Sequence, residues 1–441
     1  MRRNSLKRYF YELLARYISF YLPAGARVAE VGPRSGLLRA ALGPRAIMVV
    51  APEYLPEEPT TVTSFAELRD APADRLVLNG VLHYTPDIQA LLDTIHGACS
   101  ADTRVVLSYF SNVWKPVFSF ASRLGLAETG SSQNWLAPSD VKNLLELSGF
   151  ELVAGSQRVL LPIYVPLLSE FVNRWIAPLP VFRVFALANI CVARPRRIGP
   201  DAALSVSVVV AARNERGNIT ALLQRIPSMG PADEVIIVEG HSSDGTWEEI
   251  QRVVATMPGR RIRTLQQTGK GKGDAVRLGF AEARGDVLMI LDADLSVPPE
   301  ELPKFYRAIT GGVGEFINGS RLVYPMEQSA MRFANMLGNK FFATAFSFLL
   351  GQPLKDTLCG TKVLRRTHYE AIARDRAYFG DFDPFGDFDL LFGAARQGLR
   401  IVELPIRYRE RVYGDTNIRR WAHGWLLLQM TLVAARRMKF I

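Results

Sequence analysis

Two aspartates follow a short apolar run at the spacing of a metal-binding pair. Asp292 and Asp294 come directly after Val287–Leu291, which has the composition of a buried strand. Residues at i and i+2 of an extended chain project to the same side, and a turn then lets both carboxylates converge. Mg²⁺ and Mn²⁺ prefer such oxygen ligands and also bind diphosphate oxygens. The pair therefore predicts a metal site; the alternative is two helix-capping acids that precede "SVPPEEL".

Other polar side chains stand at the ends of neighbouring predicted strands. Glu215 follows "SVSVVVAA" and Glu239 ends "EVIIVEG", where a carboxylate can accept hydrogen bonds from a base or ribose. Lys272, in the glycine-rich "TGKGKGDA", can approach phosphates through its ammonium charge. Arg321 follows "EFINGS" and can clamp a phosphate. Turns, helix caps and surface charge are the structural alternatives for these residues.

The elements that position these residues alternate short apolar strands with amphipathic helices, and the pattern recurs in both halves of the chain. It predicts an α/β fold with open parallel sheets, whose ligands bind beyond the carboxyl ends of the strands. The stretch "ARPRRIGPDAAL", residues 193–204, has the composition of a linker. We expect two domains, 1–195 and 204–420, joined by 196–203 and followed by an amphipathic helix at 421–441.

Length and composition agree with two globular domains. The chain has 441 residues, 48% of them hydrophobic and 22% charged. Its net charge of +10 predicts an anionic partner. Nucleic acid is not expected, because the sequence has no recognition helix or aromatic RNA-binding motif. The three cysteines lack zinc spacing and favour a reducing compartment.

Three apolar segments bear on membranes, although no apolar run approaches the roughly 20 residues that span a bilayer. They are residues 160–182, 333–350 and 421–441, and the last places Trp425 and Leu432 on one helical face between basic ends. Amphipathic helices with basic ends can lie in the membrane interface. Each segment alone is better explained as core. Together they predict peripheral attachment to the cytoplasmic face of a membrane.

The motif series of the second half resembles family 2 glycosyltransferases, which have the GT-A fold. The matching stretches are "VSVVVAARNERGNI", "EVIIVEGHSSDGT", "GKGKGDAVRLGFAEARGDVLMILDADLSVPPEEL" and "GSRL". Two later stretches, "DTLCGTKVLRR" and "IVELPIRYRERVYGDTNI", are similar to the branch that makes dolichyl- or polyprenyl-phosphate sugars. The resemblance covers about residues 204–420. It implies inverting transfer from a nucleoside diphosphate sugar to a polyprenyl phosphate or other anionic lipid, with Mg²⁺ or Mn²⁺.

The resemblance also implies roles for individual residues. The nucleotide would be surrounded by Ala211, Arg213, Glu215 and Glu239, the metal held by Asp292 and Asp294, and a phosphate held by Arg321. Arg411 and Thr416-Asn417 match a basic element that closes over the site. Ala211 and Arg213 stand where the family usually has proline and an aromatic residue, and Asn417 replaces a lysine. These departures concern base and sugar specificity more than the reaction.

A cluster of aspartates is the place to look for a general base. The stretch "FGDFDPFGDFDLLFGAARQG" contains Asp381, Asp383, Asp387 and Asp389, and the family's helical acid falls near Asp389. A hydroxyl acceptor would need such a base. A phosphate acceptor is already anionic at neutral pH and needs none. The alternative for Asp381 and Asp383 is turn and cap formation.

The first half resembles class I S-adenosylmethionine-dependent methyltransferases, which are Rossmann-like, over about residues 24–195. "RVAEVGPRSG" matches their first motif with Glu30, Gly32 and Gly36, and "DRLVLNGVLHYTPDIQALL" matches their fourth with Asn79. These residues would form an S-adenosylmethionine site. Arg34 replaces the motif's central glycine, however, and Val49 stands where an acid should bind the ribose. A degenerate domain with a binding or structural role is the alternative.

Three other functions compete with transfer to a polyprenyl phosphate. The first is transfer to a hydroxyl acceptor, and the second is a methyltransferase whose GT-A half only binds a glycan or nucleotide. The third is a non-catalytic membrane scaffold. The intact pair Asp292 and Asp294 argues against the last two. The sequence does not define the sugar, the base or the oligomeric state.

Overall fold

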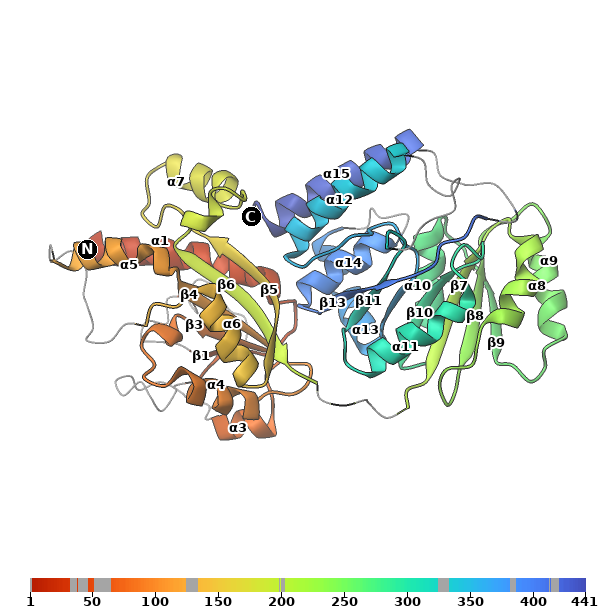
Figure 1. The fold of residues 1–441 in the computed structure, drawn as a ribbon, viewed down its shortest axis with the longest axis horizontal. Helices are drawn as coiled ribbons and strands as arrows, with labels where there is room; N and C mark the ends of the chain where they lie inside the picture. The colour runs from red at the N-terminus through yellow and green to blue at the C-terminus, as the bar shows by residue number, and fades with distance from the viewer. Residues whose placement is uncertain are drawn as a thin grey trace. The chain divides into compact units, whose positions relative to one another are not determined.

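The chain divides into two compact units in the computed structural model (Figure 1). One unit comprises Met1–Arg197 with Ala435–Ile441, and the other comprises Ile198–Ala434. The structure describes residues 2–31, 38, 47–50, 65–123, 134–197, 199, 203–323, 333–380, 386–411, 413 and 420–441. Along these residues no helix combines the length and the apolar character needed to cross a membrane.

The second unit is built on a seven-stranded mixed sheet of order β13-β11-β12-β10-β7-β8-β9. Its strands are β7 (Val206–Ala212), β8 (Glu234–Glu239), β9 (Ile262–Gln266), β10 (Val287–Asp292), β11 (Phe316–Ser320), β12 (Lys362–Arg365) and β13 (Ile401–Pro405). Strands β10, β7, β8 and β9 are parallel neighbours, whereas β12 is antiparallel to β10 and β11. The α/β class is confirmed. The expectation of a parallel sheet is wrong for β12, because the alternation of strands and helices in a sequence does not specify strand direction.

Helices cover both faces of this sheet. They are α8 (Arg216–Arg225), α9 (Thr246–Ala255), α10 (Lys272–Glu282), α11 (Leu302–Thr310), α12 (Phe333–Leu350), α13 (Arg366–Arg374), α14 (Asp387–Arg396) and α15 (Arg420–Met438), with 3-10 turns η6 (Pro299–Glu301) and η7 (Arg376–Tyr378). Helices α8, α9 and α11 share one hydrophobic core with Val208 and Val210. Successive strand residues alternate faces. Because Gly279 of α10 packs against Val209, α10 lies on the opposite face.

The first unit has a six-stranded sheet of order β2-β1-β3-β4-β6-β5. Its strands are β1 (Val28–Val31), β2 (Ile47–Val50), β3 (Arg75–Asn79), β4 (Arg104–Phe110), β5 (Phe150–Arg158) and β6 (Ala188–Pro195). Strands β1 to β4 pair in parallel, and β6 is antiparallel to β4 and β5. The chain moves outward from β1 to β2 and then returns to β3 on the other side of β1. This reversal creates a crevice beyond the carboxyl ends of β1 and β3.

The helical elements of the first unit are α1 (Arg2–Ile18), α3 (Phe65–Asp70), α4 (Ile88–Gly97), α5 (Lys115–Arg123), α6 (Pro138–Leu147) and α7 (Leu168–Phe171), with η1 (Ser19–Tyr21), η2 (Val81–His83), η3 (Asn112–Trp114), η4 (Val172–Ile176) and η5 (Arg183–Phe185). The last residues of the chain also belong here. Arg158 donates to the carbonyls of Met438 and Lys439, at 3.1 and 2.6 Å, and Trp175 stacks on Phe440. A cation at the end of α15 suits the carbonyls that a helix leaves unpaired there.

Candidate active site

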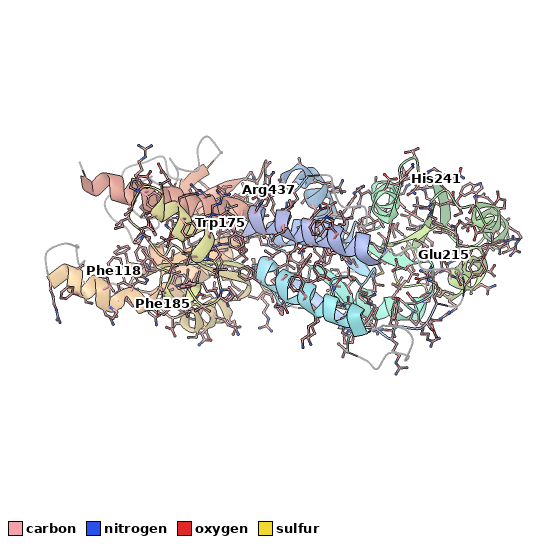
Figure 2. All side chains as sticks on the ribbon, turned by 90° about the horizontal axis from the view of Figure 1, so that it is seen from above. Phe118, Trp175, Phe185, Glu215, His241 and Arg437 are labelled. Carbon is pink, nitrogen blue, oxygen red and sulfur yellow. The ribbon has the colours of Figure 1, made fainter. Side chains whose placement is uncertain are left out.

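The predicted site residues of the second unit lie at one edge of its sheet. Strands β10, β7 and β8 are adjacent and parallel, and their register aligns Asp292 with Ala211 and Ala212 with Glu239. Their carboxyl ends therefore meet at the same edge. Arg213 is exposed just beyond β7, and Glu215 is buried at the start of α8. Figure 2 shows Glu215 and His241 within the second unit.

Asp292 is held as an anion by a lysine from the next helix. Lys272 begins α10 and places its Nζ 2.6 Å from Asp292 Oδ1. Burial alone would raise the pKa of Asp292, but Lys272, together with the charges of Lys362 and Arg321, holds that pKa below its ordinary value. The carboxylate is therefore charged at neutral pH.

Asp294 and Glu215 share one arginine. Arg411 Nη2 lies 2.6 Å from Asp294 Oδ2, and its Nη1 lies 3.4 Å from Glu215 Oε1. The other oxygen of Asp294 accepts hydrogen bonds from the amide and hydroxyl of Ser296, at 3.0 and 2.6 Å. Arg411 is far in sequence from Asp294 and Glu215. The chain after β13 must therefore return to this edge of the sheet to place the guanidinium beside the two carboxylates.

Glu215 is a carboxyl of the edge whose pKa is raised rather than lowered. Burial raises its pKa to about 7, and the negative charges of Asp294 and Asp292 add to the rise, although a hydrogen bond from Asn218 and the charge of Arg411 oppose it. The Asn218 Nδ2 lies 2.6 Å from Glu215 Oε2. Carboxyls whose pKa is shifted by burial and by nearby charges are typical of functional sites, and also of structural networks of ion pairs.

A glycine lets another chain segment approach the carboxylates. A Cβ built on Gly360 would lie 2.5 Å from Lys272 Nζ and would collide with Asp292 Oδ2. Real side chains do not tolerate such separations. A side chain at residue 360 would therefore require the ends of the Asp292 and Lys272 side chains to shift away from the segment that leads into β12.

Glu239 and the turn after it are organised by short hydrogen bonds. Glu239 Oε1 accepts from the amide of Ser242 at 2.5 Å. Asn214 and His241 adopt positive φ, at 56° and 57°, which is uncommon outside glycine. Asp244 accepts from the amide of Thr246, the first residue of α9, at 3.0 Å. The two strand ends are thus held in tight turns.

Arg321 is bound by a buried carboxylate. Its Nε and Nη2 lie 2.7 and 2.8 Å from the two oxygens of Asp356, which is fully buried. The guanidinium also stacks over the Tyr408 ring, 5.2 Å from its centroid. The Nε and Nη2 of Arg321 therefore both point to Asp356. The positive charge of Arg321 still helps to lower the pKa of Asp292.

Asp389 lies on α14 and is ion-paired. Arg376 Nε is 2.7 Å from Asp389 Oδ2. The start of α14 lies against the start of α10, because a Cβ on Gly386 would be 2.8 Å from Gly273 Cα. Asp381, Asp383, Thr416 and Asn417 and the side chain of Asp387 lie outside the described residues.

Sequence reasoning did not single out three residues that shape this edge. Asp356 binds Arg321, Gly360 admits the chain beside Asp292, and the buried Lys362 adds positive charge there. All three fall in "DTLCGTKVLRR", which drew attention only through family resemblance. A single glycine and a single lysine form no periodic pattern, so the sequence does not show that Gly360 and Lys362 lie beside Asp292.

The first unit brings together two of its predicted site residues. Asn79 Nδ2 lies 3.2 Å from Glu30 Oε1, at the carboxyl ends of β3 and β1 where the strand order reverses. Asn79 Oδ1 accepts from Ser108 Oγ at 3.2 Å, and Glu30 and Asn79 are both buried. Gly32, Arg34 and Gly36 and the side chain of Val49 are outside the described part of the chain.

Known proteins match about half of the chain. The dolichol-phosphate mannosyltransferase of Pyrococcus furiosus is 31% identical over 222 residues, and the match covers 49% of this chain and 60% of that protein. The chain therefore spans less than two thirds of that relative. A crystal structure of glucosyl-3-phosphoglycerate synthase from Mycobacterium tuberculosis with Mn²⁺, UDP and product matches 53% of this chain and 80% of that one, at 19% identity and a TM-score of 0.40.

A mixed α/β sheet with paired carboxylates at one edge defines the second unit as a GT-A-like domain. The family model described as glycosyl transferase family 2 matches residues 207–373. The dolichyl-phosphate hexose transferase of Haloferax volcanii is 32% identical over 222 residues, which are 50% of this chain and 89% of that protein. The chain belongs to glycosyltransferase family 2, as its motifs predicted.

Proposed function

We propose that the second unit transfers a sugar from a nucleoside diphosphate sugar to a polyprenyl phosphate, at the cytoplasmic face of a membrane. One observation carries the proposal: Asp292 and Asp294 lie at the strand edge with Lys272 and Arg411 as their counter-ions. Two carboxylates and two cations on one edge can bind a metal and a diphosphate together. The family and the names of the relatives agree with this chemistry.

The donor set fits a hard divalent cation. Asp292 and Asp294 offer carboxylate oxygens, and the charges around Asp292 hold it ionised. Mg²⁺ or Mn²⁺ bound there would stabilise the negative charge that develops on the leaving diphosphate. Such a cation would compete with Lys272 and Arg411 for the carboxylates. The two cationic side chains would then be available to the diphosphate oxygens.

The remaining edge residues suit the nucleotide. Ala211, Arg213 and Glu239 border the carboxyl ends of β7 and β8, where a base and ribose can lie against backbone and carboxylate. Glu215 and Arg411 bridge this region to Asp294. In the reaction, an acceptor phosphate oxygen attacks the anomeric carbon. The bond from that carbon to the diphosphate oxygen breaks, and the nucleoside diphosphate leaves with inversion.

The state of Asp389 favours a phosphate acceptor over a hydroxyl one. Asp389 is ion-paired with Arg376, so one of its oxygens is engaged by a guanidinium rather than turned to a substrate hydroxyl. A hydroxyl acceptor needs a base near the attacking oxygen, whereas a phosphate acceptor is anionic already. Transfer to a hydroxyl acceptor, with Asp389 as base, is the second candidate function.

The first unit is proposed to be a methyltransferase-like domain with little or no affinity for S-adenosylmethionine. Glu30 and Asn79 stand at the crevice expected for such a site, yet they bond to each other and are buried. The sequence adds Arg34 in the glycine turn and Val49 at the ribose position. A binding or structural role follows from these features.

A transfer assay tests the proposed function. The full chain is incubated with Mn²⁺, a panel of nucleoside diphosphate sugars and a short-chain polyprenyl phosphate dispersed in detergent, and lipid products are analysed by mass spectrometry. We expect one sugar to appear on the lipid phosphate. Transfer only to hydroxyl acceptors offered in parallel would contradict the proposed acceptor.

A further inference from the structure

The first unit exposes a long run of large apolar side chains between residues 160 and 185, here called the apolar loop. It contains α7, η4 and η5. Its exposed apolar members are Ile163, Tyr164, Leu167, Leu168, Phe171, Trp175, Leu179, Val181, Phe182, Val184 and Phe185. Leu167 is 88% exposed and Val181 71%. Monomeric soluble proteins rarely expose so many neighbouring apolar side chains, and such patches mark interaction sites.

A second apolar element adjoins this loop. The indole Nε1 of Trp114 donates to the carbonyl of Phe185 at 2.8 Å, so η3 and α5 lie beside η5. Val113, Val117 and Phe120 of this element are more than half exposed. Figure 2 shows Phe118, Trp175 and Phe185 within the first unit. The apolar loop and residues 112–123 therefore form one surface.

Buried polar side chains hold the loop in one shape. Asn173 is fully buried and accepts from the amides of Leu160 and Leu161, at 2.9 and 3.0 Å, while its Nδ2 donates to the Leu161 carbonyl at 2.7 Å. Ser169, also fully buried, accepts from the Val165 amide and donates to the Ile163 carbonyl, both at 2.7 Å. A surface that is apolar outside and hydrogen-bonded inside is preformed.

The same bonds suit the loop to a lipid environment. Backbone groups in hydrocarbon must find partners within the protein, because lipid offers none. Amides of α7 and η5 bond within the loop, and Pro162, Pro166, Pro178 and Pro180 have no amide hydrogen to satisfy. Leu167 adopts a positive φ of 64°, a costly conformation for leucine, where its side chain is most exposed.

The charges on this surface are complementary to an anionic membrane. The two segments carry four basic residues, Lys115, Arg123, Arg174 and Arg183. Their single acid, Glu170, is ion-paired with Arg16 at 2.7 Å. Basic residues are attracted to an anionic leaflet, and tryptophan and tyrosine favour the membrane interface.

We propose that the apolar loop and residues 112–123 insert into the interfacial region of an anionic bilayer. In the described parts of the other two apolar segments, Phe346, Leu349 and Leu350 of α12 are buried while Phe341 is exposed, and α15 exposes a stripe that includes Trp425 and Leu432. This inference rests on the proposed function for its purpose, because a polyprenyl phosphate has its head group at the membrane surface. Binding to lipid is nevertheless measurable without any transfer.

Vesicle co-sedimentation of the full chain tests the proposal. Wild type and the double variant Leu167→Asp/Phe182→Asp are mixed with vesicles of neutral lipid alone or with added anionic lipid. We expect wild type to bind anionic vesicles best, and the double variant to bind at least about tenfold more weakly, because burying each large apolar side chain is worth roughly 1.5–3 kcal/mol. A matched control is Leu147→Asp at the end of α6, since Leu147 is 68% exposed outside this surface. It should bind as wild type does.

Two results would overturn the inference. One is binding of the double variant equal to that of wild type. The other is a wild type that ignores vesicles but forms concentration-dependent oligomers that the double variant does not form, which would make the surface a protein interface. Transfer to the detergent-dispersed acceptor separates the two proposals. A variant that loses vesicles but retains this transfer supports both, whereas vesicle binding without any transfer by wild type contradicts only the proposed function.

Discussion

Both units place polar residues at the carboxyl ends of adjacent strands, but the two edges differ in charge. In the second unit four charged groups, Asp292, Lys272, Asp294 and Arg411, are paired and still partly exposed. In the first unit the polar pair is Glu30 with Asn79, and it is buried. A shared α/β architecture therefore supplies a place for ligands in each unit. Accessible, ionised groups distinguish the edge where chemistry is proposed.

The largest effect is expected at the two carboxylates proposed to bind the metal. Asp294→Asn should lower sugar transfer by about three orders of magnitude. The variant has one anionic ligand fewer for the metal that would stabilise the leaving diphosphate. The melting curve should change little, since Asp294 lies at the sheet edge, where it is bonded to Ser296 and Arg411. Rates are measured with saturating Mn²⁺.

The matched control for this variant lies at the other end of β10. Asp286 precedes that strand and accepts from the amide and hydroxyl of Ser205, at 3.0 and 2.6 Å. Asp286→Asn makes the same chemical change far along the strand from Asp292 and should retain transfer. Equal loss in both variants would show a general effect on folding and would remove the distinction between the two edges.

A methyl group beside Asp292 should have the next largest effect. Gly360→Ala would force apart the loop before β12 and the Lys272–Asp292 pair. A displacement of about 1 Å at a reacting site can lower the rate roughly 100-fold. Gly338→Ala, where a Cβ meets nothing within 4 Å, is the control and should be fully active. An active Gly360→Ala enzyme would mean that the close approach is unimportant.

Replacing Asp389 should matter less than replacing Asp294. If the acceptor is a phosphate, Asp389→Asn weakens the ion pair with Arg376 without removing a catalytic base, and the rate should fall by no more than about tenfold. The two variants are assayed side by side with the same lipid phosphate. A loss at Asp389 as complete as that at Asp294 would favour a hydroxyl acceptor activated by this carboxylate.

The raised pKa of Glu215 should appear in the pH dependence of stability. A folded pKa of about 7 exceeds the unfolded value near 4.3, so the folded chain binds the extra proton between these pH values. The stability this group contributes is present below about pH 4 and is lost as the pH rises through 7. We therefore compare the melting temperature of Glu215→Gln with that of wild type at two pH values. The variant's advantage over wild type should be roughly 2–4 °C larger at pH 8 than at pH 5. A constant difference would contradict the shift.

The smallest response is expected in the first unit. Titration calorimetry with S-adenosylmethionine should give little or no heat, because Glu30 and Asn79 are bonded to each other and buried. A dissociation constant in the low micromolar range would show an intact site. It would also erase the contrast between a charged, open edge and a closed one.

The sequence predicted the elements with strong periodicity and the residues at their ends. The run Val287–Leu291 forms most of β10, and the predicted amphipathic helix at 421–441 corresponds to α15 (Arg420–Met438). The carboxylates that end parallel strands meet, because such strands end at a common edge. Family membership was likewise evident from ordered motifs.

Long-range partners were beyond the sequence. Nothing local to Arg411 shows that it bridges Asp294 and Glu215, and nothing local to Arg321 shows that Asp356 binds it. Strand direction was also hidden, since β12 carries no mark of being antiparallel. These features depend on where distant segments pack, whereas hydrophobic period reports only local conformation.

The most direct test of the central claim is the lipid product formed by wild type and by Asp294→Asn in the same experiment. Each protein is incubated with Mn²⁺, a polyprenyl phosphate and the nucleoside diphosphate sugar that raises its melting temperature most. The mass of the lipid product is then measured by mass spectrometry. The account predicts a sugar on the lipid phosphate with wild type and about a thousandfold less with the variant. An unmodified lipid phosphate with wild type, or equal product with both proteins, would contradict it.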